Sequence, residues 1–361
     1  MINLMDYSCE ELQEYMISLG QPRWRGRQVF EKLLLGVTSF DELTNIPKDL
    51  RETLGNNSYL GIPQIVEKFE SAIDGTVKYL FKLADGNIIE SVVMEYKHGR
   101  TICISTQIGC KMGCTFCASA KLGFIRNLSA GEMLGQVIAA NKDMGIRISN
   151  VVLMGIGEPL DNYENVIKFL KLANDENGLN IGGRHFSLST SGIVPRIYDL
   201  MEEGLGLTLS VSLHASNDEE RSKLMPVNNK YSIDNLLEAC KIYSRTTKRR
   251  ITFEYALIAE ENDSVKDAEA LGKLLKGILC HVNLIPVNHV SGILYRKSGK
   301  EAIKKFVSVL AKYKIEATVR REMGSDINAA CGQLKRQYDK AVGAPSKEDN
   351  DIARLSEIEN V

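Results

Sequence analysis

The sequence lacks any apolar run of 18 or more residues, which excludes a membrane-spanning helix. It contains a single tryptophan and five histidines among 361 residues, and its 44% hydrophobic and 25% charged content is ordinary for a globular protein. Its eight cysteines show no paired spacing, and the acidic, amphipathic stretch 1–14 does not resemble a signal peptide. We therefore expect a cytoplasmic, reducing setting and no membrane partner.

A strong excess of either charge is also missing, because 45 Lys and Arg face 46 Asp and Glu, for a net charge of −1. The distribution is uneven: residues 71–343 hold 36 basic against 30 acidic residues, whereas both ends of the chain are acidic. Basic clusters lie at 23–27, 248–250, 320–321 and 335–336. A single cluster of this kind is usually a solvated loop, but several beside one core are compatible with an RNA partner.

The most distinctive motif is a C-x3-C-x2-C run formed by Cys110, Cys114 and Cys117, with Phe116 directly before the last thiol. Three thiolates on one loop can hold three irons of a [4Fe–4S] cluster and leave the fourth iron open to a second cofactor. Zinc is the alternative, but a closed zinc site needs a fourth ligand. No Cys or His lies between Cys117 and His185, so zinc would need a ligand from far along the chain.

Residues 1–62 read as a small helical domain, which begins with a capping box of Ser8 and Glu11. Its basic residues make it a candidate RNA-binding domain. We expect Trp24 to fill the small core of this domain rather than to stack on a base. Residues 63–98 alternate like strands and form a β extension, with a hairpin turn at 85–86.

Strands and helices alternate over residues 99–343, which predicts an α/β fold built as a partial (β/α)6 barrel. Strands are expected at 101–108, 150–155, 185–190, 207–213, 251–258, 281–287 and 315–320, and helices at 130–144, 163–174, 264–277 and 300–313. The remaining residues, 344–361, are predicted to be a disordered acidic tail.

Small or polar residues follow several of these predicted strands, at 155–159, 187–192, 210–214 and 286–288. In parallel α/β folds the carboxyl ends of the strands meet on one surface, where ligands bind. The cysteine motif also follows a predicted strand. The sequence therefore predicts one surface that combines a cluster loop with a ring of hydrogen-bonding groups.

With these features the chain resembles the radical S-adenosylmethionine (SAM) superfamily, whose cysteine signature has an aromatic residue before the third thiol. The resemblance implies that Cys110, Cys114 and Cys117 hold a [4Fe–4S] cluster and that Gly157 and Glu158 hold the amino group of SAM. It also implies that the nucleoside or methionine part of SAM is contacted by residues at five further positions. These are Ser189, Ser212, Leu213, His214 and Asn288.

Three further segments resemble a narrower family, the adenine-C2 methyltransferases of 23S ribosomal RNA, some of which also modify an adenine in transfer RNA. These segments are Cys103, the stretch 188–192, and the stretch 329–334 that contains Cys331. Carbon 2 of adenine lies between two ring nitrogens and is a poor nucleophile, so a radical route suits it better than polar methyl transfer. The resemblance covers residues 1–340.

This resemblance implies roles for three more side chains. Cys331 takes a methyl group from one SAM molecule, and a second SAM, cleaved at the cluster, activates that methyl group for attack on the adenine. Glu90 then removes a proton from the covalent protein–RNA adduct, and Cys103 resolves the adduct through a disulfide with Cys331. The family pattern also implies an electron donor such as flavodoxin or ferredoxin, and we expect a monomer.

Two other functions stay open at this point. The first is a sister enzyme that methylates carbon 8 of the same adenine and confers antibiotic resistance, although Pro159 after Glu158 favours the C2 branch. The second is a non-enzymatic, zinc-stabilised RNA-binding protein.

Overall fold

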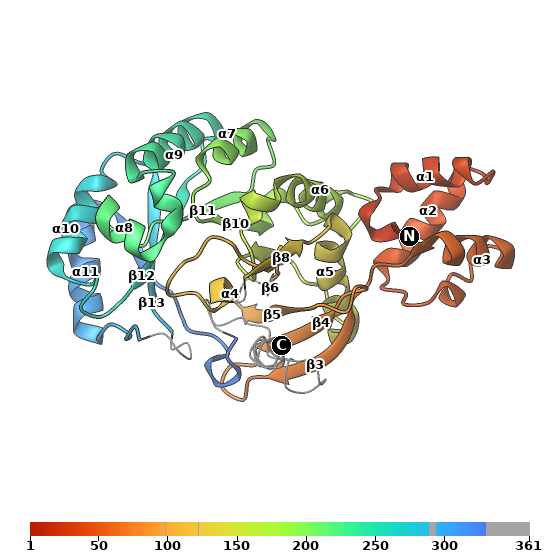
Figure 1. Ribbon diagram of the computed structural model, residues 1–361, viewed down its shortest axis with the longest axis horizontal. Helices are drawn as coiled ribbons and strands as arrows, with labels where there is room; N and C mark the ends of the chain where they lie inside the picture. The colour runs from red at the N-terminus through yellow and green to blue at the C-terminus, as the bar shows by residue number, and fades with distance from the viewer. Residues whose placement is uncertain (98, 122, 289–293, 330–361) are drawn as a thin grey trace, which may run out of the picture.

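A curved ten-stranded sheet organises the protein, whose structure is a computed structural model describing residues 1–97, 99–121, 123–288 and 294–329 (Figure 1). Its strands run in the order β14-β13-β12-β11-β10-β9-β6-β5-β4-β3. The seven from β14 to β6 are parallel, and β5, β4 and β3 continue the same sheet antiparallel. Because β14 and β3 are its two edges, the sheet is open, and the predicted partial barrel is confirmed.

The strands of this sheet are β3 (Gln64–Glu70), β4 (Val77–Lys82), β5 (Ile88–Tyr96), β6 (Gly99–Cys103), β9 (Asn150–Leu153), β10 (Phe186–Thr190), β11 (Thr208–Ser212), β12 (Ile251–Leu257), β13 (Cys280–Pro286) and β14 (Glu316–Val319). Two small sheets join β1 (Ile2–Asn3) to β2 (Ser58–Tyr59), and β7 (Gln107–Gly109) to β8 (Phe124–Asn127). The parallel strands alternate with helices, as β/α units require.

Helices cover the outer side of the parallel strands, and a separate group of three forms a lobe at one end of the molecule (Figure 1). The core helices are α5 (Ala130–Met144), α6 (Tyr163–Asn174), α7 (Val194–Glu202), α8 (Asp218–Leu224), α9 (Ile233–Thr247), α10 (Val265–Leu274) and α11 (Lys300–Lys312), with α4 (Ala118–Lys121) after the cysteine loop. The lobe contains α1 (Cys9–Ser18), α2 (Trp24–Leu34) and α3 (Lys48–Asn57). The four predicted core helices all form, with ends within three residues of those expected.

The prediction of one continuous strand over 101–108 was wrong, because β6 ends at Cys103 and β7 begins only at Gln107. The backbone N–H of Ser105 donates to the side-chain oxygen of Gln136 (2.9 Å), and the Ser105 carbonyl accepts from the Gln136 amide (3.0 Å). One buried side chain on α5 therefore replaces the strand ladder at this residue. The chain then forms β7, which pairs with β8 and carries the cysteine loop away from the sheet.

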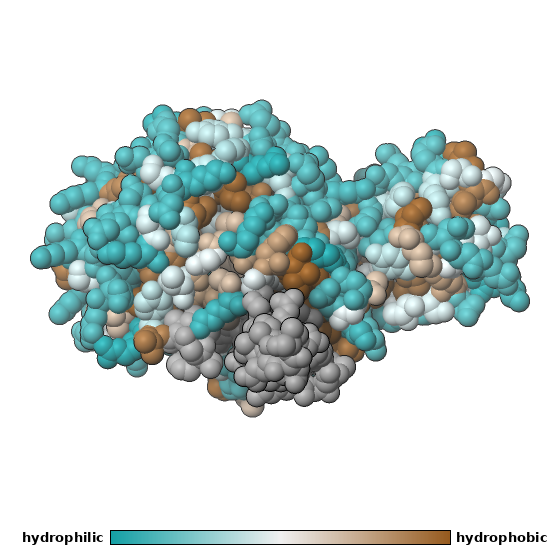
Figure 2. Space-filling view, viewed as in Figure 1, coloured by the Kyte–Doolittle hydropathy of each residue, from teal (hydrophilic) through white to brown (hydrophobic). Residues whose placement is uncertain are grey.

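The N-terminal lobe confirms the capping box, since the Ser8 hydroxyl accepts the Glu11 N–H (3.1 Å) and the Glu11 carboxylate accepts the Ser8 N–H (2.7 Å). The expectation that Trp24 fills the lobe's core was wrong, because Trp24 is 52% exposed. The buried residues of α2 are Gly26, Val29, Phe30 and Leu33, which recur every three or four residues on the other side of the helix. Other hydrophobic side chains of this lobe, such as Ile17 and Leu35, are also exposed, and hydrophobic groups show on its surface in Figure 2.

No helix in the described ranges is long and apolar enough to cross a membrane. Cys331 and the predicted tail at 344–361 lie outside the described residues.

Candidate active site

The three motif cysteines lie on the loop between β7 and α4, and all three line one cleft. Gly109 and Gly113 adopt left-handed backbone conformations, with φ values of 74° and 73°, which let the loop turn tightly. The loop is tied to α8, because the Thr115 N–H donates to the carbonyl of Leu224 (3.0 Å). The core therefore holds in place the loop that presents the three cysteines to the cleft.

The donor set of this loop fits a cationic iron cluster. Burial raises the pKa of Cys110 to about 12 and raises that of Cys114 still further, and the neighbouring cysteines add to both shifts. Three thiolates therefore need bound positive charge to coexist here, which three cluster irons supply. Within the described ranges, no three or more His, Cys, Asp or Glu side chains surround one point where a lone metal ion would bind.

The cleft continues from the cysteines across the carboxyl ends of the parallel strands and contains about 1090 Å³ of empty space, including its open mouth. That is enough for a nucleoside-sized ligand beside a cluster. Six of the seven residues expected to contact SAM line it, namely Gly157, Glu158, Ser189, Ser212, His214 and Asn288. The seventh, Leu213, turns its side chain into the hydrophobic core, so only its backbone faces the strand ends.

Glu158 is 3% exposed, and its carboxylate accepts the backbone N–H of Leu160 (3.0 Å) and of Ser191 (2.6 Å). Burial raises its pKa even though these donors favour the charged form. Its own N–H donates to the side chain of Gln107 (2.9 Å). At Gly157, where φ is 111°, a Cβ atom would lie 2.6 Å from that of Gln107, so only glycine fits. The carboxylate is thus held rigidly where a ligand ammonium group could reach it.

His214 contributes a ring whose protonation follows from its contacts. Its Nδ1 accepts the backbone N–H of Ala256 (2.9 Å), so the ring hydrogen is on Nε2. Burial, aided by the charge of Arg221, lowers its pKa to about 3, so the ring is neutral near pH 7. Its left-handed backbone (φ 56°) is supported by Asn262, whose amide donates to the His214 carbonyl (2.8 Å). His214 therefore offers the cleft one N–H donor and no charge.

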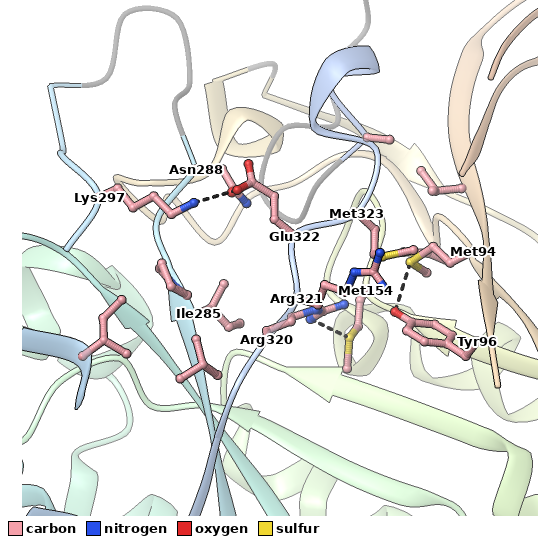
Figure 3. A pocket seen from close by; sticks show the side chains of 16 residues that line it. Met94, Tyr96, Met154, Ile285, Asn288, Lys297, Arg320, Arg321, Glu322 and Met323 are labelled. Carbon is pink, nitrogen blue, oxygen red and sulfur yellow. Dashed lines mark hydrogen bonds and ion pairs between the residues drawn. The ribbon is translucent and has the colours of Figure 1, made fainter. Parts of the chain in front are cut away.

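A second pocket adjoins the cleft (Figure 3). Cys103, which is 8% exposed, is one of its lining residues. The two cavities share Met154, Ile285, Asn288 and Arg320 as lining residues. The Arg320 guanidinium donates to the sulfur of Met154 (3.7 Å). Because both residues line both cavities, they form a wall between them. Around the rest of the second pocket lie Tyr96, Met94, Arg321 and the ion pair of Lys297 with Glu322 (2.6 Å).

Glu90 lies on the same face of the sheet as this pocket. In the antiparallel register Val92 is opposite Cys103, and Glu90 is two residues before Val92 on β5. Side chains two residues apart on a strand share a face, so the carboxylate is one pleat away from the thiol. Glu90 is 1% exposed. Cys331 is outside the described residues, but Ala329, near the end of the described chain, lines the Cys103 pocket.

Sequence reasoning missed several residues that shape this site. Arg320 lines both cavities, and its position at the end of β14 was the available signal, although it was interpreted only as part of a basic cluster. Glu254 is buried in the cleft and accepts from Asn283 (2.8 Å), and a carboxylate inside an otherwise apolar strand was a signal. Gln107 and Arg221 left no comparable local signal, because their partners are distant in sequence.

Comparison with known proteins places this geometry in a family. Residues 104–271 match the model of the radical SAM superfamily, and residues 2–60 match the model described as the ribosomal RNA large subunit methyltransferase N-terminal domain. The first match covers the cysteine loop and the parallel strands β9 to β12, and the second covers the helical lobe.

Relatives match over nearly the whole chain. A protein of Clostridium acetobutylicum described as "Probable dual-specificity RNA methyltransferase RlmN" is 55% identical over 94% of this chain and 98% of its own length. A protein of Clostridium botulinum strain Eklund 17B with the same description is 56% identical, again over 94% of this chain and 98% of its own.

A solved structure agrees with these matches. The crystal structure of a radical SAM methyltransferase from Sphaerobacter thermophilus superposes with a TM-score of 0.90 at 43% identity, and covers 93% of this chain and 99% of its own. These relatives are enzymes, so the non-enzymatic zinc-protein alternative no longer applies. The chain belongs to the radical SAM family of dual-specificity RNA methyltransferases, which use a [4Fe–4S] cluster and S-adenosylmethionine.

Proposed function

We propose that this enzyme methylates carbon 2 of an adenine in 23S ribosomal RNA and of an adenine in the anticodon loop of transfer RNA. One observation carries the proposal: the cysteine-lined cofactor cleft and the Cys103 pocket share the wall formed by Met154 and Arg320. A cofactor in the first cavity and an extruded base in the second would thus be neighbours. Such an arrangement suits a reaction in which the base is reached outside its stack.

The residues of the cleft would hold the cofactors in the following way. Cys110, Cys114 and Cys117 would ligate the cluster, and Glu158 would accept hydrogen bonds from the SAM ammonium group. His214 would donate through Nε2. When bound, the two cofactors supply the one-electron cleavage that generates a carbon radical. The protein positions them and excludes water.

Cys331, Glu90 and Cys103 would act on the RNA. Cys331 would carry the one-carbon unit and become linked through that carbon to the adenine. Glu90 would take the proton that leaves the adduct. The thiolate of Cys103 would then attack the sulfur of Cys331, which forms a disulfide and breaks the sulfur–carbon bond. The released carbon keeps the electron pair, gains a proton and becomes the methyl group. A thiol reductant must reopen the disulfide before the next turnover.

The N-terminal lobe, residues 1–62, would bind RNA outside the catalytic pocket. The exposed Trp24 ring has the guanidinium of Arg25 4.0 Å from its centroid, and such an aromatic–cation pair offers a flat surface to an unpaired base. We also propose that the protein acts as a monomer and receives electrons from a small carrier such as flavodoxin or ferredoxin.

The test is to incubate the anaerobically purified enzyme with SAM, a reductant and either a 23S ribosomal RNA fragment or transfer RNA. Nucleoside mass spectrometry should then find adenine methylated at carbon 2 in both RNAs. Methylation at carbon 8 would instead assign the sister activity, and modification of one RNA alone would remove the other from the proposal. A Trp24→Ala variant should weaken RNA binding and leave SAM cleavage unchanged.

A further inference from the structure

Arg221 is a fully buried arginine directly behind the cofactor cleft. It lies on α8 and is 0% exposed. Its guanidinium donates to the backbone carbonyls of Ser191 (2.7 Å), Ser212 (3.0 Å) and Leu213 (3.2 Å). A charged side chain is seldom buried completely unless its donors are bonded, and here one group serves two separate strand ends.

The bonded carbonyls belong to the residues that form the cleft. Ser191 directly follows β10, and Ser212 is the last residue of β11. Both serines line the cleft, and the Ser191 N–H also donates to the carboxylate of Glu158. The guanidinium therefore holds one side of the peptides whose other side faces the cofactor.

Other side chains hold the guanidinium in one orientation. Its fourth bond is to the side-chain oxygen of Asn228 (2.9 Å). The Asn228 amide donates to the backbone carbonyl of Asp218 (3.1 Å), to its carboxylate (2.9 Å) and to the hydroxyl of Ser222 (2.9 Å). A buried network with this many hydrogen bonds holds its side chains rigidly.

The same helix also holds the cysteine loop. Leu224 on α8 accepts the N–H of Thr115, which lies between two of the motif cysteines. Cys114 and Phe116 pack against the buried Leu224 and Met225. One short helix therefore contacts both the strand ends of the cleft and the loop for the cluster.

The charge of Arg221 persists in this setting. Burial lowers its pKa, with Cys114 and Asp218 acting in the opposite direction, to about 10. Near neutral pH the side chain is therefore a cation that is shielded from bulk solvent. Fixed charge next to a metal cluster shifts its reduction potential, because the added electron is more stable near a cation.

We propose that Arg221 is a positioning residue with two effects on the cofactors. Its guanidinium holds the ends of β10 and β11 in the shape that binds SAM, and its positive charge, on the helix whose Leu224 packs near Cys114, makes the cluster easier to reduce. This proposal rests on the assignment of the cleft to SAM and the cluster. The arginine touches neither cofactor, and it acts through the peptides and through its charge.

Two variants separate the effect of the guanidinium hydrogen bonds from the effect of the positive charge. Arg221→Lys keeps a cation but cannot bond three carbonyls and Asn228 at once. Arg221→Gln removes the charge and keeps a shorter donor. Arg249→Gln is the matched control, because Arg249 donates to the carbonyl of Leu207 (2.8 Å), directly before the opposite end of β11. It removes a comparable arginine–carbonyl bond away from the cleft.

Each cluster-loaded protein is examined for iron content, SAM affinity by equilibrium dialysis, and cluster midpoint potential by a redox titration followed by electron paramagnetic resonance. Losing one or two of the carbonyl bonds should weaken SAM binding about tenfold or more in both Arg221 variants. The potential should become more negative in Arg221→Gln and stay near the wild-type value in Arg221→Lys. Arg249→Gln should change neither quantity.

Equal SAM affinity in the wild type, Arg221→Lys and the Arg249→Gln control would overturn the positioning role. Equal potentials in Arg221→Gln and the wild type would overturn the electrostatic role. If Arg221→Gln fails to fold, the lysine variant still decides the positioning role by its SAM affinity, and a second uncharged variant, Arg221→Met, takes the place of the glutamine variant in the redox titration. Failure of the wild-type protein itself to hold a cluster or bind SAM would instead remove the proposed function.

Discussion

Glu158→Gln tests whether the buried carboxylate organises the cofactor cleft. The carboxylate bonds the N–H of Leu160 through one oxygen and that of Ser191 through the other. Glutamine has the same shape but only one acceptor oxygen, so one of the two N–H groups would face an amide nitrogen. The position is 3% exposed, so water cannot replace the lost acceptor easily.

The size of the effect follows from these contacts. A buried donor left without an acceptor costs about 1–3 kcal/mol, so the free energy of unfolding should fall by about that amount. A hydrogen bond between charged groups is worth about 1.5–3 kcal/mol, so losing the carboxylate opposite the SAM ammonium group should weaken binding about 10- to 100-fold. The two losses can be measured separately, because the loss of unfolding free energy is measured without SAM.

Urea unfolding of the cluster-free protein measures the first loss, and equilibrium dialysis with SAM on the cluster-loaded protein measures the second. Glu203→Gln is the control, because that carboxylate pairs with Lys171 (2.8 Å) on the surface. A Glu158→Gln protein with wild-type SAM affinity would show that Glu158 does not meet the cofactor. Unchanged stability would show that the two backbone bonds are dispensable.

Three further predictions concern the chemistry and its pH dependence. Cys103→Ala should accumulate protein covalently linked to RNA, visible as a retarded band on a denaturing gel; normal release of product would mean that another group resolves the adduct. Cys331→Ala should retain the cluster and bind SAM but transfer no methyl group, and methylated RNA from this variant would refute the carrier role. For His214, the folded pKa of about 3 lies below the usual 6.5, so its contribution to stability is present above pH 6.5 and is lost as the pH falls toward 3. Between pH 7 and pH 5 the cluster-free wild type should therefore lose about 2 kcal/mol more unfolding free energy than His214→Asn, and parallel pH curves would show that the ring titrates normally.

Local features of this protein were predictable because their partners are close in sequence. The spacing of Cys110, Cys114 and Cys117, the Ser8–Glu11 capping box and the helix at 130–144 all depend on contacts within a few residues. The position of Leu213 was also readable, since it follows Ser212 on a strand whose side chains alternate between cleft and core. The family pattern instead predicted that Leu213 contacts SAM together with Ser212 and His214. The structure places the Leu213 side chain on the core face, opposite the cleft.

Other features depended on where the chain folds back. The spacing of Val29 and Phe30 indicates a buried face on α2, but the close packing of Gly26 against the backbone of Gln13 on α1, which leaves the indole of Trp24 outside, depends on how the chain folds back. The strand expected at 101–108 ends early because Gln136, about thirty residues later, bonds the peptide of Ser105. Residue preference alone favours continuing the strand, and a long-range hydrogen bond overrides it.

By itself the sequence determined the cofactor chemistry, because three thiols on one loop and polar residues after successive strands are properties of spacing along the chain. Only the tertiary structure decided which of the remaining groups act together. The register of β5 with β6 brings Glu90 and Cys103 to one face, and the wall of Met154 and Arg320 joins their pocket to the cofactor cleft. Helix α8 places Arg221 behind that cleft. These relations join residues far apart in sequence, and sheet register and helix packing set them only once the whole core has formed.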